Sequence, residues 1–237
     1  MAKAALVTGG AKRLGRALAL GLAREGFDLA VHYNTSETDA KSVAAEIAAL
    51  GRKCELCSCD LADTAAARSM IDRVFDSMPT CELLVNNASI FERRSFDETD
   101  ERFLDRTLAV NFKAPFFLSQ QFARRCGRGH VINLLDTKIS QNFTPYFAYT
   151  LSKKVLAEFT RLAACELAPR IRVNGVCPGA ILPAAGQSAE SFARLSSRVP
   201  LARPGNGDAI VAAVVYLVRN DFVTGECLFV DGGEHLQ

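Results

Sequence analysis

The sequence lacks an excess of charge of either sign. It contains 28 lysines and arginines against 26 aspartates and glutamates, a formal net charge of +2 over 237 residues. Proteins that bind nucleic acid or an anionic membrane surface through their charge carry a clear basic excess. We therefore expect no nucleic-acid partner and no membrane partner for this chain.

Long apolar runs are absent as well. The longest, residues 209–218, is far shorter than the roughly 20 residues that span a bilayer. The first residues, MAKAALVTGG, contain no apolar core of the roughly 7–15 residues typical of a signal peptide. We expect a cytoplasmic protein, in a compartment where thiols stay reduced.

A complete zinc motif is also missing. Cys54, Cys57 and Cys59 lie close together, but Cys81 stands alone and no histidine follows nearby. A structural zinc site needs a second ligand pair at suitable spacing. A chain of this length buries enough core to be stable without disulfides. We expect no metal and interpret the eight cysteines as small, mostly apolar side chains.

What the sequence does contain is a regular alternation of short apolar runs with helical patterns. Strands are expected at 4–7, 27–33, 54–59, 83–85, 131–135, 171–176 and 227–230. Strands separated by helices pair in parallel through right-handed crossovers, and such strands are buried on both faces. The pattern predicts one domain, 1–237, of the α/β class. Its architecture is a Rossmann-type doubly wound parallel sheet of about seven strands with helices on both faces.

The first loop at the carboxyl edge of this sheet, TGGAKRLG at 8–15, is rich in glycine. Glycines directly after a first strand let the backbone approach a pyrophosphate at a helix N-terminus. The loop therefore predicts a dinucleotide site that includes Gly9 and Leu14. Lys12 and Arg13 add positive charge to the same loop.

The end of the second strand lacks the carboxylate that NAD enzymes use for the ribose 2′-hydroxyl. It reads His32, Tyr33, Asn34, Thr35, Ser36. With Lys12 and Arg13 nearby to meet a 2′-phosphate, the pattern favours NADP(H). The alternative, that His32 and Tyr33 merely finish a strand, stays open.

A tyrosine and a lysine follow the strand at 131–135. Tyr149 and Lys153 are four residues apart at the start of an expected helix and so share a face. An ammonium group beside a phenol stabilises the phenolate and lowers its pKa, which makes the tyrosine a usable acid near neutral pH.

These motifs, taken together, resemble the short-chain dehydrogenase/reductase family over nearly the whole chain. The landmarks are the glycine loop, Asp60-Leu61, Asn86-Asn87-Ala88, Asn111, Tyr149 with Lys153, Arg172-Val173-Asn174, Pro178-Gly179 and Val230-Asp231-Gly232-Gly233. The resemblance implies that Asp60 and Leu61 flank the adenine, that Asn87 and Ala88 line the cofactor cleft beside Ser89, and that Lys153 also holds the nicotinamide ribose. It further implies a cofactor loop at Pro178-Gly179 and a homotetramer.

Three departures from the usual family pattern narrow the resemblance. Arg13 replaces the middle glycine of the loop, Ser89 replaces the glycine after Asn-Asn-Ala, and Asp136 replaces the catalytic serine. In all three the chain resembles the pteridine reductases, and the closing segments 222–225 and 231–235 also resemble the bacterial dihydromonapterin or dihydrofolate reductases of the same branch. That resemblance implies a pterin stacked on Phe91, with Tyr146 lining the same pocket. It also implies that Arg13 reaches both cofactor phosphate and substrate.

The aspartate also carries a chemical argument of its own. A serine hydroxyl donates a hydrogen bond to the oxyanion formed when a ketone is reduced, whereas a carboxylate repels that charge. A carboxylate suits a substrate with N–H donors, or a ring nitrogen that must be protonated. Asp136 is thus matched to reduction of a C=N bond. The alternative is an ordinary loop or helix-capping aspartate.

Two further segments bear on the site. If 102–124 is one helix, Pro115 cannot donate to the carbonyl of Asn111, which is then free to hold a water; the family uses this asparagine in a proton route to the lysine. An ordinary proline kink is the alternative.

The segment 181–205, with a short helix at 191–197, is expected to form a substrate lid. Ile181 replaces a small hydroxyl residue common in the family.

The sequence thus predicts an NADPH-dependent reductase that transfers a hydride to a C=N bond of a pterin or dihydrofolate-like substrate. Tyr149, activated by Lys153, and Asp136, through a water, supply protons, and Phe91 positions the ring. Two rival functions remain: a carbonyl or 3-oxoacyl-thioester reductase, and an NADP(H)-binding regulatory protein without turnover.

Overall fold

A single parallel sheet of seven strands, in the order β3-β2-β1-β4-β5-β6-β7, forms the centre of the molecule. The computed structural model describes residues 3–184 and 186–237. The strands are β1 (Ala4–Val7), β2 (Asp28–Tyr33), β3 (Cys54–Ser58), β4 (Cys81–Asn86), β5 (Gly129–Leu134), β6 (Ile171–Pro178) and β7 (Cys227–Val230). The predicted fold class and strand number are confirmed.

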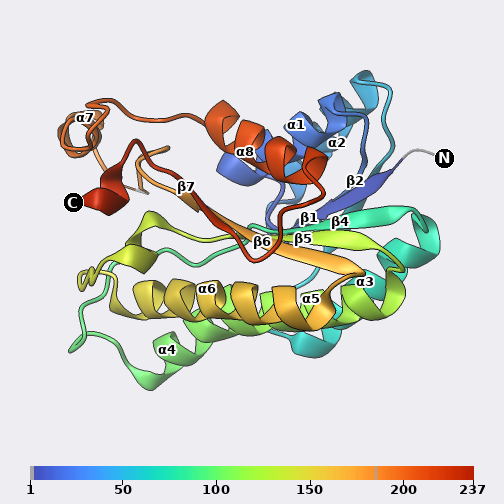
Figure 1. Ribbon diagram of the computed structural model, residues 1–237, viewed down its shortest axis with the longest axis horizontal. Helices are drawn as coiled ribbons and strands as arrows, with labels where there is room; N and C mark the ends of the chain where they lie inside the picture. Colours follow the sequence, from blue (N-terminus) through green and yellow to red (C-terminus); the bar gives the residue numbers. More distant parts are fainter. Residues whose placement is uncertain (1–2, 185) are drawn as a thin grey trace.

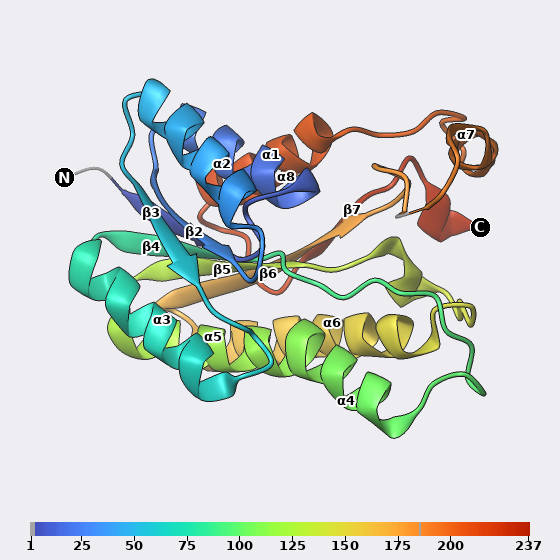
Figure 2. The ribbon, with the colours of Figure 1, turned by 180° about the vertical axis from the view of Figure 1, so that it is seen from behind.

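Helices cover both faces of the sheet (Figures 1 and 2). One face carries α1 (Arg13–Arg24), α2 (Glu37–Ala49) and α8 (Gly207–Arg219). The other carries α3 (Thr64–Ser77), α4 (Glu101–Leu108), α5 (Ala114–Arg125) and α6 (Phe147–Leu167). Because helices cover both faces of the sheet, the side chains of the central strands are buried on both sides and do not alternate between apolar and polar. Every residue of β1 is buried. Two large buried clusters result, one on each face.

One expected helix differs in detail. The rod predicted at 102–124 consists of α4, a π-helical turn η1 (Ala109–Lys113), and α5. The N–H of Ala114 bonds to the carbonyl of Ala109, five residues back, and Pro115 follows at the start of α5 with no N–H to donate. The proline therefore widens one turn instead of kinking a continuous α-helix, and such turns are frequent at functional sites.

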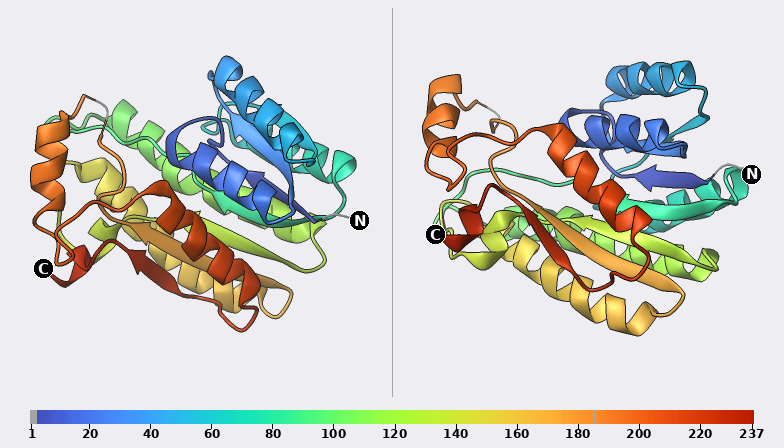
Figure 3. Two further views of the ribbon diagram at one scale, coloured as in Figure 1. Left: turned by 90° about the horizontal axis from the view of Figure 1, so that it is seen from above. Right: turned by 45° about the horizontal axis from the view of Figure 1, so that its top comes forward.

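The carboxyl ends of the strands meet the lid and the C-terminus at one end of the molecule. The short helix α7 (Ala189–Ser196), the 3₁₀ turn η2 (Thr137–Ser140) and the 3₁₀ turn η3 (Glu234–Leu236) gather there, as Figure 3 shows for α7 and the C-terminus. Within 3–184 and 186–237, no helix combines the length and apolarity needed to cross a bilayer.

Candidate active site

The glycine loop is held open by hydrogen bonds from the end of β4. The hydroxyl of Thr8 accepts from the N–H groups of Asn87 and Ala88 at 2.9 and 3.0 Å. The side-chain amide of Asn87 donates to the carbonyls of Thr8 and Gly9 at 2.8 and 3.2 Å. Gly9 has φ +61°, which favours glycine. Thr8, which the sequence analysis did not select, is therefore central to the shape of the loop.

The glycine loop leads into the N-terminus of α1, where there is no room for a side chain at Gly15. A Cβ added at Gly15 would lie 2.0 Å from the carbonyl oxygen of Gly9 and 2.6 Å from the amide nitrogen of Asn87. An adjoining cavity of about 390 Å³ is lined by Gly9, Lys12, Arg13, Leu14, Gly15, His32, Asn34, Asp60, Leu61, Asn87, Ala88, Ser89, Ile90, Arg106 and Val110. A glycine cradle at a helix N-terminus, flanked by two cations, fits the pyrophosphate and phosphate groups of a dinucleotide.

Most of the predicted cofactor residues are thus brought together. Tyr33 is the last residue of β2 and Ser36 is the N-cap of α2, and neither lines this cavity. Lys12 forms an exposed ion pair with Asp39 at 3.0 Å. The two cations remain at the cavity wall, where a phosphate could replace the exposed carboxylate at little cost.

Arg13 occupies a conformation that favours glycine. Its φ is +49°, and its guanidinium donates to the carbonyl of Pro183 at 2.6 Å. A side chain in this left-handed region carries strain, offset here by a contact between the cofactor loop and the start of the lid.

His32 is a buried support for the loop. Its Nδ1 accepts from the N–H of Gly9 at 3.1 Å, and its Nε2 lies 3.1 Å from the carbonyl of Cys59. These partners require a neutral ring with the proton on Nε2. Burial lowers the pKa of His32, which favours that neutral form. His32 therefore does more than finish a strand.

Asp60 has a partner that the sequence did not reveal. Arg106 of α4 donates to both carboxylate oxygens, at 2.9 and 3.3 Å, and the N–H of Ala62 donates to Oδ1 at 2.9 Å. The hydrogen bonds from Arg106 hold the pKa of Asp60 below its usual value. The two residues are 46 positions apart, so no local motif could have pointed to Arg106.

The catalytic candidates meet where β5 ends and α6 begins. The hydroxyl of Tyr149 donates to Oδ2 of Asp136 at 2.6 Å, and the N–H of Lys138 donates to Oδ1 at 2.8 Å. The ammonium of Lys153 donates to the carbonyl of Leu134 at 2.6 Å and lies 5.7 Å from the centre of the Tyr149 ring. Helical spacing places Tyr149 and Lys153 on one buried face, as predicted.

The expectation that Lys153 lowers the pKa of Tyr149 is wrong for this arrangement. Burial, followed by the charge of Asp136 and its hydrogen bond, raises the pKa of Tyr149 well above its usual value. Burial also raises the pKa of Asp136 and lowers that of Lys153 to about 8. The ammonium of Lys153 makes no hydrogen bond to the Tyr149 hydroxyl in the described residues, so burial and the carboxylate of Asp136 act in the same direction.

Asn111 anchors the adjoining loop. Its Oδ1 accepts from the N–H of Ile90 at 2.7 Å, and its Nδ2 donates to the carbonyl of Ile90 and the hydroxyl of Ser152, each at 3.0 Å. The buried side chain thus ties the π-helical turn η1 to the loop that carries Phe91 and to α6. The carbonyl of Asn111 stays a candidate water ligand.

Aromatic rings lead away from the tyrosine. Phe91 meets Tyr149 edge-on at 4.6 Å between ring centres, and stacks on Tyr146 at 4.4 Å with 4° between the planes. Phe143 continues the stack against Tyr146 at 5.8 Å. Phe91 is 47% exposed. A large apolar ring left open beside buried polar groups is typical of a ligand site.

The C-terminal turn fastens the loop that carries Asp136. The hydroxyl of Thr137 donates to the buried carboxylate of Asp231 at 2.6 Å, and Lys138 forms a largely buried ion pair with Glu234. The side chain of Gln141 donates to the carbonyl of Glu234 at 3.0 Å. None of these partners of η2 was expected from the sequence, because the contacts join segments more than 90 residues apart.

The model of a protein family described as enoyl-(acyl carrier protein) reductase matches residues 9–235. The chain belongs to the short-chain dehydrogenase/reductase family. A solved structure of FolM alternative dihydrofolate reductase 1 from Brucella suis, in complex with NADP, is 35% identical with a TM-score of 0.95, covering 99% of this chain and 96% of that one.

Two curated relatives of this family are similar to the chain at nearly the same level. Pteridine reductase 1 from Leishmania tarentolae is 33% identical over 283 residues, covering 99% of this chain and 97% of the relative. A 3-oxoacyl-(acyl-carrier-protein) reductase from Staphylococcus aureus is 32% identical over 244 residues, covering 100% and 99%. Overall similarity therefore shows an oxidoreductase of the short-chain dehydrogenase/reductase family and leaves the substrate to the residues of the site.

The remaining short-chain reductase landmarks lie beside this site. Pro178 ends β6, and a Cβ on Gly179 would lie 2.6 Å from Cβ of Asp231, so the loop packs directly on the C-terminal turn.

Burial raises the pKa of Cys54 to about 11 and of Cys57 to about 12, which keeps both as thiols. Among the residues that the structure describes, no three His, Cys, Asp or Glu side chains are grouped as metal ligands.

Proposed function

We propose that the protein is an NADPH-dependent reductase that transfers a hydride to a C=N bond of a pterin or dihydrofolate-like substrate. The observation that carries the proposal is the 2.6 Å hydrogen bond from Tyr149 to Asp136, the carboxylate that stands where the family pattern has a serine. The structures solved with NADP and the pteridine reductase relative are consistent with it.

NADPH, when bound, supplies the hydride. Gly9 and Gly15 would leave space for its pyrophosphate, Lys12 and Arg13 would bind the 2′-phosphate, and Asp60 and Leu61 would flank the adenine. All of these residues line the same cavity.

Asp136 and Tyr149 supply the proton. Their hydrogen bond holds a proton between two buried oxygens, and burial raises the pKa of both groups. Reduction of C=N forms a C–H bond from the hydride and an N–H bond from a proton, so the ring nitrogen takes the proton from this pair, directly or through a water. Lys153, held by the carbonyl of Leu134, offsets the negative charge left behind.

The main rival is reduction of a ketone or a 3-oxoacyl thioester, as named for the Staphylococcus aureus relative. In that reaction the oxygen of the substrate becomes negative next to Asp136, and like charges repel. A second rival, a cofactor-binding protein without turnover, leaves the buried Tyr149, Lys153 and Asp136 group unexplained.

The decisive experiment measures NADPH oxidation with dihydrobiopterin, dihydromonapterin and dihydrofolate, and with acetoacetyl-CoA as the ketone. We expect turnover with at least one pteridine, a fall of about 10²–10⁴ in kcat for Tyr149→Phe, and a similar fall for Asp136→Asn. Asp136→Ser should lose pteridine turnover. If none of the three pteridines is reduced, or if Asp136→Ser retains full pteridine activity, the proposal is wrong.

A homotetramer remains part of the proposal. Leu162, on the outer side of α6, is 72% exposed, and large exposed apolar side chains gather where chains associate. Light scattering of the purified protein at micromolar concentration should give about four times the chain mass of 25.6 kDa.

A further inference from the structure

The lid segment, residues 181–205, carries an unusual share of positive charge. It contains Arg194, Arg198 and Arg203 but one acidic residue, Glu190, so its net charge equals the +2 of the entire chain. The rest of the molecule is balanced. Positive charge is therefore concentrated on a segment that contacts the cofactor loop through the hydrogen bond from Arg13 to the carbonyl of Pro183.

Two of these guanidinium groups are available for a ligand. Arg194 touches Glu190 at 3.3 Å, but both side chains are mostly exposed, and such a pair is readily exchanged. The side chain of Arg198 has no ion-pair or hydrogen-bond partner among residues 3–184 and 186–237. Its main-chain carbonyl, in contrast, accepts from Gln237 at 2.9 Å, which holds the backbone in place.

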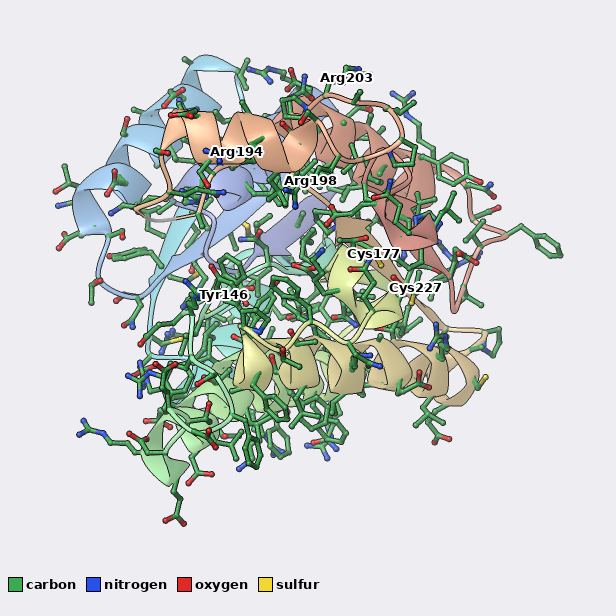
Figure 4. All side chains as sticks on the ribbon, turned by 90° about the vertical axis from the view of Figure 1, so that its left-hand side faces the viewer. Tyr146, Cys177, Arg194, Arg198, Arg203 and Cys227 are labelled. Carbon is green, nitrogen blue, oxygen red and sulfur yellow. The ribbon has the colours of Figure 1, made fainter. Side chains whose placement is uncertain are left out.

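The position of these arginines relative to the aromatic stack is visible in Figure 4. Arg194 and Arg198 belong to α7 and its following turn and lie on the side of α7 nearer Tyr146, whereas Arg203 lies on the opposite side. Tyr146 is the middle ring of the stack Phe91, Tyr146, Phe143 that leads outward from Tyr149. In this view the two arginines thus lie between the rest of α7 and the aromatic residues outside the catalytic pair.

We propose that Arg194 and Arg198 bind the carboxylates at the end of a substrate tail, so that the enzyme prefers pteridines with an aromatic, anionic tail to pteridines with a short neutral one. This inference rests on the proposed function, because it takes the pteridine ring to lie beside Phe91 and Tyr149. A substituent on that ring leaves along the aromatic stack, where an aromatic linker packs well. Carboxylates beyond the linker reach guanidinium groups, which bind them in a forked geometry.

The lid is also linked to the cofactor loop. Arg13 of that loop donates to the carbonyl of Pro183 at 2.6 Å, close to the start of the lid. The same loop meets the cofactor phosphates, so the base of the lid is fixed by the part of the protein that holds NADPH. We therefore test tail recognition on the NADPH-loaded protein.

The experiment compares KM for dihydrofolate, whose tail ends in carboxylates, with KM for dihydrobiopterin, whose tail is neutral. In the double variant Arg194→Ala/Arg198→Ala, loss of two exposed charge-assisted contacts predicts a rise of about tenfold in KM for dihydrofolate. KM for dihydrobiopterin and kcat for both should stay within about twofold. For the unmodified protein, raising the salt from 50 to 500 mM should raise KM for dihydrofolate alone.

Arg203→Ala is the matched control. It removes one charge of the same kind from the same segment, on the side of α7 away from Tyr146, and should leave both KM values unchanged. The variant Arg194→Lys/Arg198→Lys keeps the charge but loses the forked geometry, so it should give an intermediate KM for dihydrofolate.

Equal changes for both substrates, no change for either, or an equal effect of Arg203→Ala would overturn the proposal. If none of the three pteridines is reduced, the proposed function fails; in that case, or if only dihydromonapterin is reduced, calorimetric titration of folate into NADP⁺-loaded protein tests the tail site by itself. Folate affinity that falls about tenfold in the double alanine variant then supports the site. Affinity that does not change, or no binding at all, overturns it.

Discussion

Replacing Glu234 by glutamine tests whether the C-terminal turn supports the catalytic loop. Glu234 pairs with Lys138, and the two side chains are only 10% and 19% exposed. Glutamine has the same shape but no charge, so the ammonium of Lys138 keeps only uncharged partners: the new amide oxygen, the side-chain oxygen of Gln141 at 3.2 Å and the ring face of Phe143 at 4.9 Å. The change therefore leaves a poorly solvated cation with neutral partners.

The expected loss follows from that burial. Breaking a fully buried ion pair by removing one partner costs about 3–5 kcal/mol. Here both side chains retain some contact with solvent, and glutamine still accepts a hydrogen bond, so we expect about 2 kcal/mol. For a protein of this size, about 2–4 °C of Tm corresponds to each kcal/mol. The variant should therefore unfold about 4–8 °C below the unmodified protein at pH 7.

Scanning calorimetry of the purified protein measures the change, with Glu37→Gln as the matched control. Glu37 pairs with Lys41, but these side chains are 60% and 68% exposed, so that variant should stay within about 0.5 kcal/mol. Lys138→Met together with Glu234→Gln removes both charges and should recover part of the loss. A Tm for Glu234→Gln within 1 °C of the unmodified protein would refute the reasoning.

Three other predictions concern the loop, the lysine and the histidine. Gly15→Ala should weaken NADPH binding by at least tenfold in a fluorescence titration, because its Cβ would lie 2.0 Å from the carbonyl of Gly9. Burial lowers the pKa of Lys153 to about 8, so if the ammonium is required, kcat should be level below pH 8 and fall about tenfold per pH unit above it. Burial lowers the pKa of His32, so below pH 6.5 the unfolded chain takes up a proton that the folded one resists. The stability contributed by His32 is thus present above pH 6.5 and lost as the pH falls toward the lowered value, and urea unfolding at pH 5 and 7.5 should show a smaller pH effect in His32→Asn.

The parts of the fold that follow local rules could be predicted from the sequence. The alternation of strands with helices was enough to place apolar runs such as Leu83–Val85 in a parallel sheet. The glycine loop and the four-residue spacing of Tyr149 and Lys153 are local as well, because a turn and a helix face decide them. The structure brings these residues to one edge of the sheet.

The interactions that set the chemistry of the site could not be predicted in this way. Arg106 reaches Asp60 across 46 residues, and Glu234 reaches Lys138 across 96. The direction of the Tyr149 pKa shift depends on burial and on the charge that bonds the hydroxyl, and helical spacing gives the face but neither of these. The π-helical turn before Pro115 could not be predicted either, because a proline in a helical segment can kink the helix or widen one turn.

Under the proposed function, the carboxylate bonded to the Tyr149 hydroxyl is also the group that separates the two candidate reactions. A ketone reductase needs a hydrogen-bond donor for the developing alkoxide, and the carboxylate of Asp136 repels that charge. For a C=N substrate the same carboxylate is an advantage, because the ring nitrogen becomes more positive as it is protonated, and Asp136 stabilises that charge at short range. Under the proposed function, the carboxylate 2.6 Å from the Tyr149 hydroxyl therefore favours C=N reduction over ketone reduction, although both begin with the same hydride. The carboxylate of Asp136 also accepts a hydrogen bond from the backbone N–H of Lys138, and the side chain of Lys138 is paired with Glu234. The position of Asp136 therefore depends on the C-terminal turn that contains Glu234.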